Sequence, residues 1–201
     1  MCCSVIAFFV LMFYRNTKII TRKHNNTVTR QHHNTMKQEF IDQSIFRLEE
    51  ALPRIVQCLN ELTEAQIWQR PNEHSNSVGN LVVHLCGNVR QYIISNLGNT
   101  SDTRTRDAEF AMRDGYDRQQ LIEKITETIQ QAVEVIRGLN EEDLMEVRSV
   151  QGFEQTGINS IIHVVEHFSY HTGQIAFWTK LVQDIDLKFY GDMDLNVLNV
   201  K

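Results

Sequence analysis

The sequence contains few residues that interrupt a helix. Two prolines and nine glycines occur among its 201 residues. Proline removes a backbone hydrogen bond from a helix and glycine weakens one, so their scarcity leaves long stretches in which helices can form. Hydrophobic residues make up 42% of the chain and charged residues 22%, which is typical of a globular protein. The length fits one domain with a buried core, and we expect that domain to be mainly helical.

The chain also lacks an excess of positive charge. Its formal net charge is −5 at pH 7, with 20 lysines and arginines against 25 aspartates and glutamates. Proteins that bind nucleic acid need a basic face for the phosphates. We therefore expect no nucleic acid partner.

Cysteine is scarce and is not arranged in pairs that suggest a metal or redox motif. The four cysteines are Cys2, Cys3, Cys58 and Cys86, and none forms a C-x-x-C motif. This spacing does not predict a disulfide framework. Reduced, buried thiols in a cytoplasmic protein are the simplest interpretation.

The apolar run at residues 2–14 (CCSVIAFFVLMFY) is too short to cross a membrane comfortably. It has thirteen residues, whereas a spanning helix needs about 20. Basic residues follow the run instead of preceding it as in a signal peptide, although a short anchor with a positively charged flank stays open. The residues from there to Thr35 lack an amphipathic period. We predict that residues 1–35 are a disordered or mis-assigned extension, that Met36 is the working start, and that residues 36–201 form the domain, with no membrane partner.

Four stretches have apolar residues at spacings of three and four, which is typical of amphipathic helices. Pro53 falls inside the first stretch, where we expect a kink or a break into two helices. Ser77, Asp117 and Thr156 are suitable N-caps for the other three. Gln151-Gly152 could form the turn of a short β-hairpin before the last helix. The sequence therefore predicts an all-α four-helix bundle. The four stretches are residues 36–62, 77–97, 117–137 and 157–182.

The last of these helices carries three histidines four residues apart, His163, His167 and His171, followed by Gln174. A step of four residues returns to nearly the same helix face, about 40° away. Two imidazoles so spaced can hold one metal ion. A third ligand has to come from elsewhere, and His84 on the second apolar helix is the best candidate. Taken alone, each feature also fits a chance pattern or a histidine satisfied in the core.

Three neutral imidazoles are suitable ligands for Zn²⁺, Ni²⁺ or Fe²⁺. We favour zinc or nickel. Gln174 could hydrogen-bond a metal-bound water or orient an imidazole. Asn88 lies one helical turn beyond His84, and a polar pair that faces a core needs partners. Cys86 points to the other side of the same helix and cannot share the metal of His84.

Residues 99–116 form a long polar segment in which Arg104 and Arg106 alternate with Asp107 and Glu109. One interpretation is a solvated loop with local ion pairs of little energetic value. The other is a lid whose arginines bind an anionic substrate group, for which the guanidinium fork is suited. The sequence alone does not decide between them.

Three segments together resemble the DinB-like (YfiT-like) family, in a branch of unknown function: SNSVGNLVVHLCGNVRQYI, RTRDAEF and HVVEHFSYHTGQI. The resemblance spans residues 40–190. It implies a four-helix bundle with a long crossover loop, and a homodimer. It also implies a divalent metal ion bound by His84, His167 and His171, with His163 in a supporting or core position.

Characterised members of that family include bacillithiol transferases and the mycothiol-dependent maleylpyruvate isomerase. The resemblance therefore implies a metal-dependent S-transferase that uses a low-molecular-weight thiol, with Arg104 and Arg106 holding carboxylates of the thiol or substrate. Two alternatives stay open. One is a metal-dependent hydrolase, for which Glu166 is the nearest carboxylate in sequence. The other is a non-catalytic bundle in which the metal staples two helices together.

Overall fold

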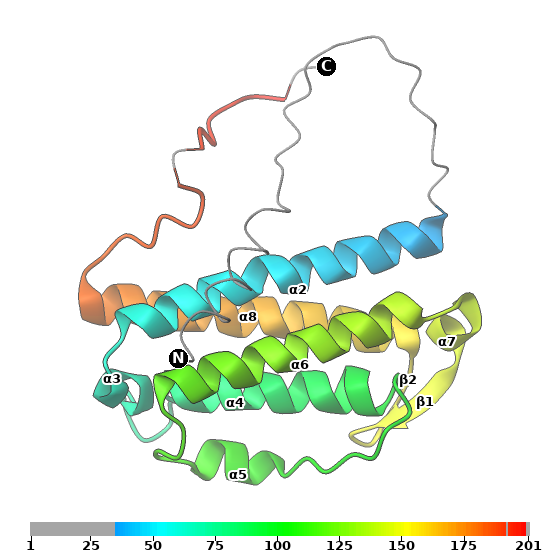
Figure 1. Ribbon diagram of the computed structural model, residues 1–201, viewed down its shortest axis with the longest axis horizontal. Coiled ribbons are helices and arrows are strands. Elements are labelled where there is room, and N and C mark those ends of the chain that lie inside the picture. Colours follow the sequence, from blue (N-terminus) through cyan, green and yellow to red (C-terminus); the bar gives the residue numbers. More distant parts are fainter. Residues whose placement is uncertain (1–34, 192, 200–201) are drawn as a thin grey trace, which may run out of the picture. The chain divides into compact units, whose positions relative to one another are not determined.

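The computed structural model describes residues 35–191 and 193–199. Four long helices pack as a bundle (Figure 1). Among the long helices, α2 and α4 come first in the chain, and each of them packs against both α6 and α8. This arrangement confirms the predicted all-α four-helix bundle. The long helices are α2 (Met36–Glu61), α4 (Val78–Val89), α6 (Arg118–Gly138) and α8 (Gly157–Gln183).

Side-chain caps fix where these helices begin. Ser77, Asp117 and Thr156 each accept a hydrogen bond from a backbone N–H three residues on, as predicted. Such a cap satisfies one of the N–H groups that a helix start leaves unpaired, and it stabilises the helix by about 1 kcal/mol. Helix α2 begins after Thr35 and continues through Pro53 without ending, so the predicted break into two helices is wrong.

The apolar faces of the four helices meet in one core. Ile55, Leu85, Ile125 and Phe168, one from each long helix, are completely shielded from solvent. Burial of a side chain of this size stabilises the fold by about 1.5–3 kcal/mol. The core therefore holds α4 and α8 in a fixed relationship, and these two helices carry the predicted metal ligands.

The connections contain more structure than the sequence predicted. The second helix changes at Val89 into the π-helical turn η1 (Arg90–Ser95). A short helix, α5 (Arg106–Ala111), lies within the polar segment that was expected to be a loop. Two further short helices are α3 (Glu64–Trp68) and α7 (Glu141–Met145). Segments of five or six residues are too short to show a helical period, which explains why the pattern did not indicate them.

The predicted hairpin is present. Strands β1 (Val147–Val150) and β2 (Phe153–Thr156) pair antiparallel immediately before α8. Both turn residues have positive φ, 52° at Gln151 and 82° at Gly152, as a tight hairpin turn requires. Tyr92 of η1 donates a hydrogen bond to Gln151 (2.8 Å), which ties the hairpin to the end of the second helix.

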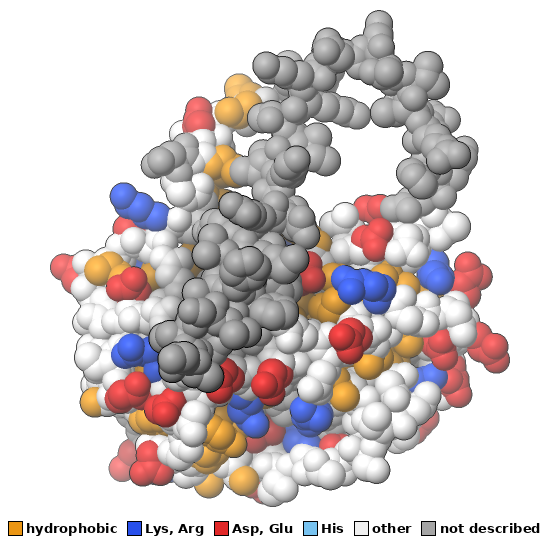
Figure 2. All heavy atoms as spheres, in the orientation of Figure 1, with side chains coloured by type: hydrophobic (Ala, Val, Ile, Leu, Met, Phe, Trp, Pro, Cys, Tyr) orange, Lys and Arg blue, Asp and Glu red, His pale blue; other side chains and the backbone are white. Residues whose placement is uncertain are grey.

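On the face shown in Figure 2, acidic and basic side chains are intermixed. Within the part of the chain that the structure describes, no helix is long and apolar enough to span a membrane. The apolar run at residues 2–14, the predicted extension up to residue 34, Cys2 and Cys3 all lie outside the described residues.

Candidate metal centre

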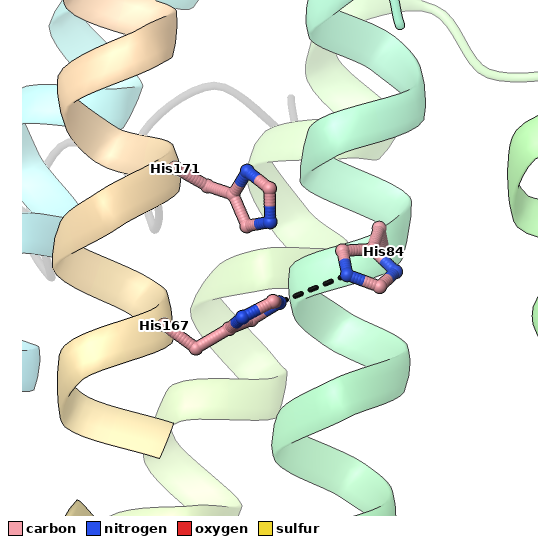
Figure 3. A group of neighbouring side chains, drawn as sticks. All are labelled: His84, His167 and His171. Carbon is pink, nitrogen blue, oxygen red and sulfur yellow. Dashed lines mark hydrogen bonds between the residues drawn. The ribbon is translucent and has the colours of Figure 1, made fainter. Parts of the chain in front are cut away.

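Helices α4 and α8 bring His84, His167 and His171 together, with their rings directed into the space between the two helices (Figure 3). One ring nitrogen of each lies within 4.8 Å of the others. Nε2 of His84 is 2.9 Å from Nε2 of His167. Tetrahedral zinc with bonds of 2.0–2.1 Å places neighbouring nitrogens about 3.3 Å apart. Small shifts of the rings are therefore enough, and these three histidines could hold a metal ion.

Two of the rings are held by hydrogen bonds at their other nitrogen. Nδ1 of His84 lies 2.9 Å from a carboxylate oxygen of Glu109, and Nδ1 of His171 lies 2.6 Å from the amide oxygen of Gln174. Both partners are acceptors, so a proton on each Nδ1 satisfies these two contacts and leaves the lone pair of each Nε2 for a metal. This is the arrangement by which metal-binding histidines are usually oriented. Nη2 of Arg104 also lies 3.1 Å from Nδ1 of His84. Gln174 thus occupies the orienting position considered from the sequence.

Burial favours the neutral form of His167 and His171, which is the form that a metal requires. It lowers the pKa of His167 to about 3, and the nearby rings of His171 and His84 add to this effect. Burial likewise lowers the pKa of His171, although its hydrogen bond to Gln174 acts in the opposite direction. A protonated imidazole cannot coordinate a cation. Both side chains of α8 are therefore available as ligands at neutral pH.

Glu109, behind His84, was not predicted as part of the site. It forms two hydrogen bonds with Arg104, from Nε (2.7 Å) and Nη2 (2.9 Å), and only 3% of the Arg104 side chain and 8% of the Glu109 side chain are exposed. Burial alone would raise the pKa of Glu109, but the hydrogen bonds from Arg104 and His84 outweigh it and lower that pKa. The result is an ionised, charge-assisted contact at Nδ1 of His84.

A glycine makes room for this carboxylate. Gly87 is on α4, and a Cβ atom there would overlap Oε1 of Glu109 and lie 2.9 Å from Nε of Arg104. Asn80, one helical turn before His84, donates from Nδ2 to the backbone oxygens of Glu109 (2.9 Å) and Met112 (3.0 Å). Helix α4 therefore supplies both the space for Glu109 and the anchor for the backbone that carries it.

The two arginines of this segment have different surroundings. Arg104 is neither solvated nor presented to a substrate, because its guanidinium is occupied by Glu109 and by Gln91 (2.9 Å). Arg106 is exposed, and its guanidinium lies over the ring of Phe110, 4.9 Å from the centroid. That ring lies 4.6 Å from the ring of His84. Helix α5 thus covers His84.

His163 does not belong to the group of three. Its Nε2 accepts a hydrogen bond from Nδ2 of Asn88 (3.2 Å), and its ring stacks on Tyr92 at a centroid distance of 4.4 Å. Its ring lies 5.5 Å from that of His167. Asn88 is 3% exposed, and its Oδ1 has no hydrogen-bond partner among the described residues. Asn88 and His163 therefore place polar groups beside His167.

Cys58 and Cys86 are free and buried. Burial raises the pKa of each thiol to about 11. A thiol that stays protonated at neutral pH is a poor nucleophile and a poor metal ligand. Neither cysteine therefore has the properties of a catalytic residue.

The family model described as "Protein of unknown function (DUF1572)" matches residues 35–191, which is more than half of the chain. The chain belongs to this family. The match covers all four long helices and the three clustered histidines. A search of curated proteins finds no match.

Solved structures share the fold of this DUF1572 member. A conserved protein from Enterococcus faecalis is 18% identical, with a TM-score of 0.62, over 72% of this chain and 97% of that one. A DinB-like protein from Bacillus cereus is 15% identical, with a TM-score of 0.55, over 74% and 93% of the two chains. The DinB-like protein YjoA from Bacillus subtilis is 17% identical, with a TM-score of 0.52, over 74% and 97%. These matches confirm the DinB-like fold.

Proposed function

We propose that this protein binds one divalent metal ion through Nε2 of His84, His167 and His171, and that it acts as an S-transferase with a low-molecular-weight thiol. The observation that carries the metal site is the convergence of three imidazoles whose ring nitrogens lie within 4.8 Å of one another. Glu109 and Gln174 support it, because they hold Nδ1 of two rings and direct Nε2 toward the common centre.

Three protein ligands leave room for a further ligand on a tetrahedral ion, which is typical of catalytic rather than structural sites. When bound, such an ion lowers the pKa of a thiol that reaches it. Within the described part of the chain, the thiols of Cys58 and Cys86 are buried and have pKa values of about 11, so the proposal takes a small-molecule thiol as the nucleophile. Arg106 is the arginine of this segment that remains to hold a carboxylate, because Arg104 is already paired with Glu109.

Zinc or nickel fits this ligand set, as does iron. A cytoplasmic homodimer is part of the proposal.

A metal-stapled bundle without catalysis is the second candidate. Its supporting observation is that the ligands come from two helices, His84 from α4 and the other two from α8. A hydrolase is supported less well. Glu109 contacts Nδ1 of His84, so the ring separates its carboxylate from Nε2, and Glu166 is exposed. Neither is placed as a general base for water at the metal.

Elemental analysis of protein purified without a histidine tag tests the metal site. We expect about one divalent ion per chain, as for a single three-histidine site. The His84→Ala variant should lose most of this metal. His163→Ala is the matched control and should keep it, because His163 is outside the group of three. Equal metal content in both variants would contradict the assignment.

Turnover assays then distinguish an S-transferase from a non-catalytic bundle in which the metal only links two helices. An S-transferase shows saturable transfer of a bacterial thiol to an electrophile, and His167→Ala abolishes it. Turnover that persists in metal-stripped protein contradicts a metal-dependent transferase. A metal that raises the melting temperature without any turnover supports the staple.

A further inference from the structure

A polar pocket opens between η1, the segment that follows it and the turn of the β-hairpin. Its volume of 380 Å³ lies within the range of about 300–1,000 Å³ that is usual for small-molecule sites. Eight of its nine lining residues are polar, and the apolar one is Val150. None of the nine belongs to the group of three histidines, so the pocket is distinct from the metal centre.

One side of the pocket is fixed by hydrogen bonds. Gln91 donates from Nε2 to a carboxylate oxygen of Asp102 (2.7 Å), and its Oε1 accepts from Nη1 of Arg104 (2.9 Å). The backbone N–H of Arg104 donates to the other oxygen of Asp102 (2.9 Å). These contacts hold Gln91 and Asp102 in one arrangement before a ligand binds, which lowers the entropic cost of binding.

Other lining residues have polar groups without a hydrogen-bond partner among the described residues. Gln151 accepts a hydrogen bond from Tyr92 at Oε1 (2.8 Å), but its Nε2 donates none. The hydroxyl of Ser149 and the side-chain amide of Asn99 form none within the described chain either. All three lining side chains are exposed. The pocket therefore offers both donors and acceptors to a ligand.

The backbone around the pocket is irregular. Asn99 and Gln151 have φ of 53° and 52°, in the left-handed region that residues other than glycine seldom adopt. Such conformations cost about 1–3 kcal/mol each and cluster at ligand sites. The third wall, η1, is a π-helical turn, and turns of this kind are frequent at functional sites.

The lining favours a neutral ligand that is rich in hydroxyl groups. It contains no lysine, arginine or histidine, and its one acidic residue, Asp102, would repel an anion. A cation would find a single carboxylate, whose two oxygens already accept hydrogen bonds. A flat apolar molecule would find one apolar side chain, Val150. Amides and hydroxyls both donate and accept hydrogen bonds, as do neighbouring hydroxyl groups on a ligand.

From these observations we propose that the pocket between η1 and the hairpin is a second ligand site, which binds a neutral polyhydroxyl compound of monosaccharide size. Gln91 and Asp102 form its fixed side, and Asn99, Ser149 and Gln151 supply the remaining hydrogen bonds. This site goes beyond the proposed metal-dependent function and does not require the metal.

Saturation-transfer NMR tests for binding, with D-glucose, D-galactose, D-mannose and N-acetyl-D-glucosamine as probes. At least one sugar should bind saturably and shift the backbone amide signals of Asn99, Ser149 and Gln151. Inorganic phosphate and methylammonium are the charged comparisons, and neither should shift these signals. The proposal is overturned if no sugar shifts them, or if either ion binds there more tightly than the sugars. The result should be the same after the metal is removed with a chelator, so failure of the metal site leaves this test unchanged.

Two variants test the assignment of the lining residues. Asn99→Gly removes the side-chain amide and keeps the left-handed backbone, which glycine adopts without strain. Ser149→Leu fills the pocket from β1, where the serine is exposed. Each should weaken sugar binding by about ten-fold, which corresponds to about 1.4 kcal/mol of lost contacts. Lys188→Gly is the matched control and should keep the affinity, because Lys188 also has positive φ (46°) but is outside the pocket. Equal affinity in all three variants overturns the proposal.

Discussion

Nδ1 of His84 lies 2.9 Å from a carboxylate oxygen of Glu109, and this carboxylate is also paired with Arg104. The three side chains form a buried chain of charge-assisted contacts that ends at a ring whose Nε2 faces His167. Each contact fixes the next one, so the orientation of His84 depends on residues that never touch the metal position. Metal affinity should therefore respond to changes at Glu109 and at the residues that make room for it.

Glu109→Gln should weaken metal binding by about 10- to 100-fold, the usual effect of losing a carboxylate behind a histidine ligand. The amide keeps the size of the side chain but removes the charge that makes it a strong acceptor for Nδ1 of His84. Competition with a chromophoric chelator measures the change in Kd. Glu134→Gln, on the exposed side of α6, is the control. Unchanged affinity in Glu109→Gln would show that His84 does not need this partner.

Gly87→Ala should weaken metal binding through the same contact. The new methyl group would overlap Oε1 of Glu109, so the carboxylate has to move away from His84. Alanine otherwise favours a helix by about 1 kcal/mol over glycine. Gly138→Ala is the matched control, because a Cβ there meets nothing within 4 Å. The same chelator competition should show a loss of affinity in Gly87→Ala and none in Gly138→Ala.

The long helices and the meeting of the three histidines could be predicted because they depend on regular patterns. Apolar spacing gives the helices, caps such as Ser77 give their starts, and a step of four residues puts His167 and His171 on one face. His84 could be added from its apolar helix and from the family resemblance. In each case the information lies within one helix or one motif.

Glu109 could not be predicted by the same means. It is 25 residues from His84, and its carboxylate reaches Nδ1 only because the polar segment folds back over α4. That fold depends on tertiary hydrogen bonds from Asn80, which leave no periodic signal in the sequence. The alternating charges at residues 104–109 were visible, but whether Arg104 faces solvent or Glu109 depends on burial.

Removal of the metal should lower the melting temperature, because the ion would link α4 and α8 in the folded state alone. With free metal at about a thousand times Kd, binding stabilises the fold by about 4 kcal/mol, which corresponds to roughly 10 °C for a domain of this size. Differential scanning calorimetry with and without a chelator measures the shift. The His84→Ala variant should show no shift with chelator, and a shift equal to that of the parent would place the metal elsewhere.

The metal-free protein should lose stability as the pH falls below neutrality. The pKa of His167 is lowered from 6.5 to about 3 in the folded state by burial, with a smaller contribution from the rings of His171 and His84. As the pH falls through 6.5, the imidazole of His167 takes up a proton in the unfolded chain but stays neutral in the folded chain. The stabilisation is therefore complete above pH 6.5 and is lost progressively toward pH 3.

Urea unfolding of the metal-free protein at pH 7 and pH 5 measures this effect, because the pKa of Glu109 is lowered from 4.5 and lies below that interval. Burial raises the pKa of Glu49, which acts in the opposite direction, and comparison of the parent with a His167 variant cancels that contribution.

Burial also lowers the pKa values of His163 and His171, so all three histidines of α8 act in the same direction. His167→Gln should reduce the loss of free energy of unfolding between the two pH values. His74→Gln removes an exposed histidine and should not change it. An equal loss in the parent and His167→Gln would show that His167 takes up its proton equally well in the folded chain.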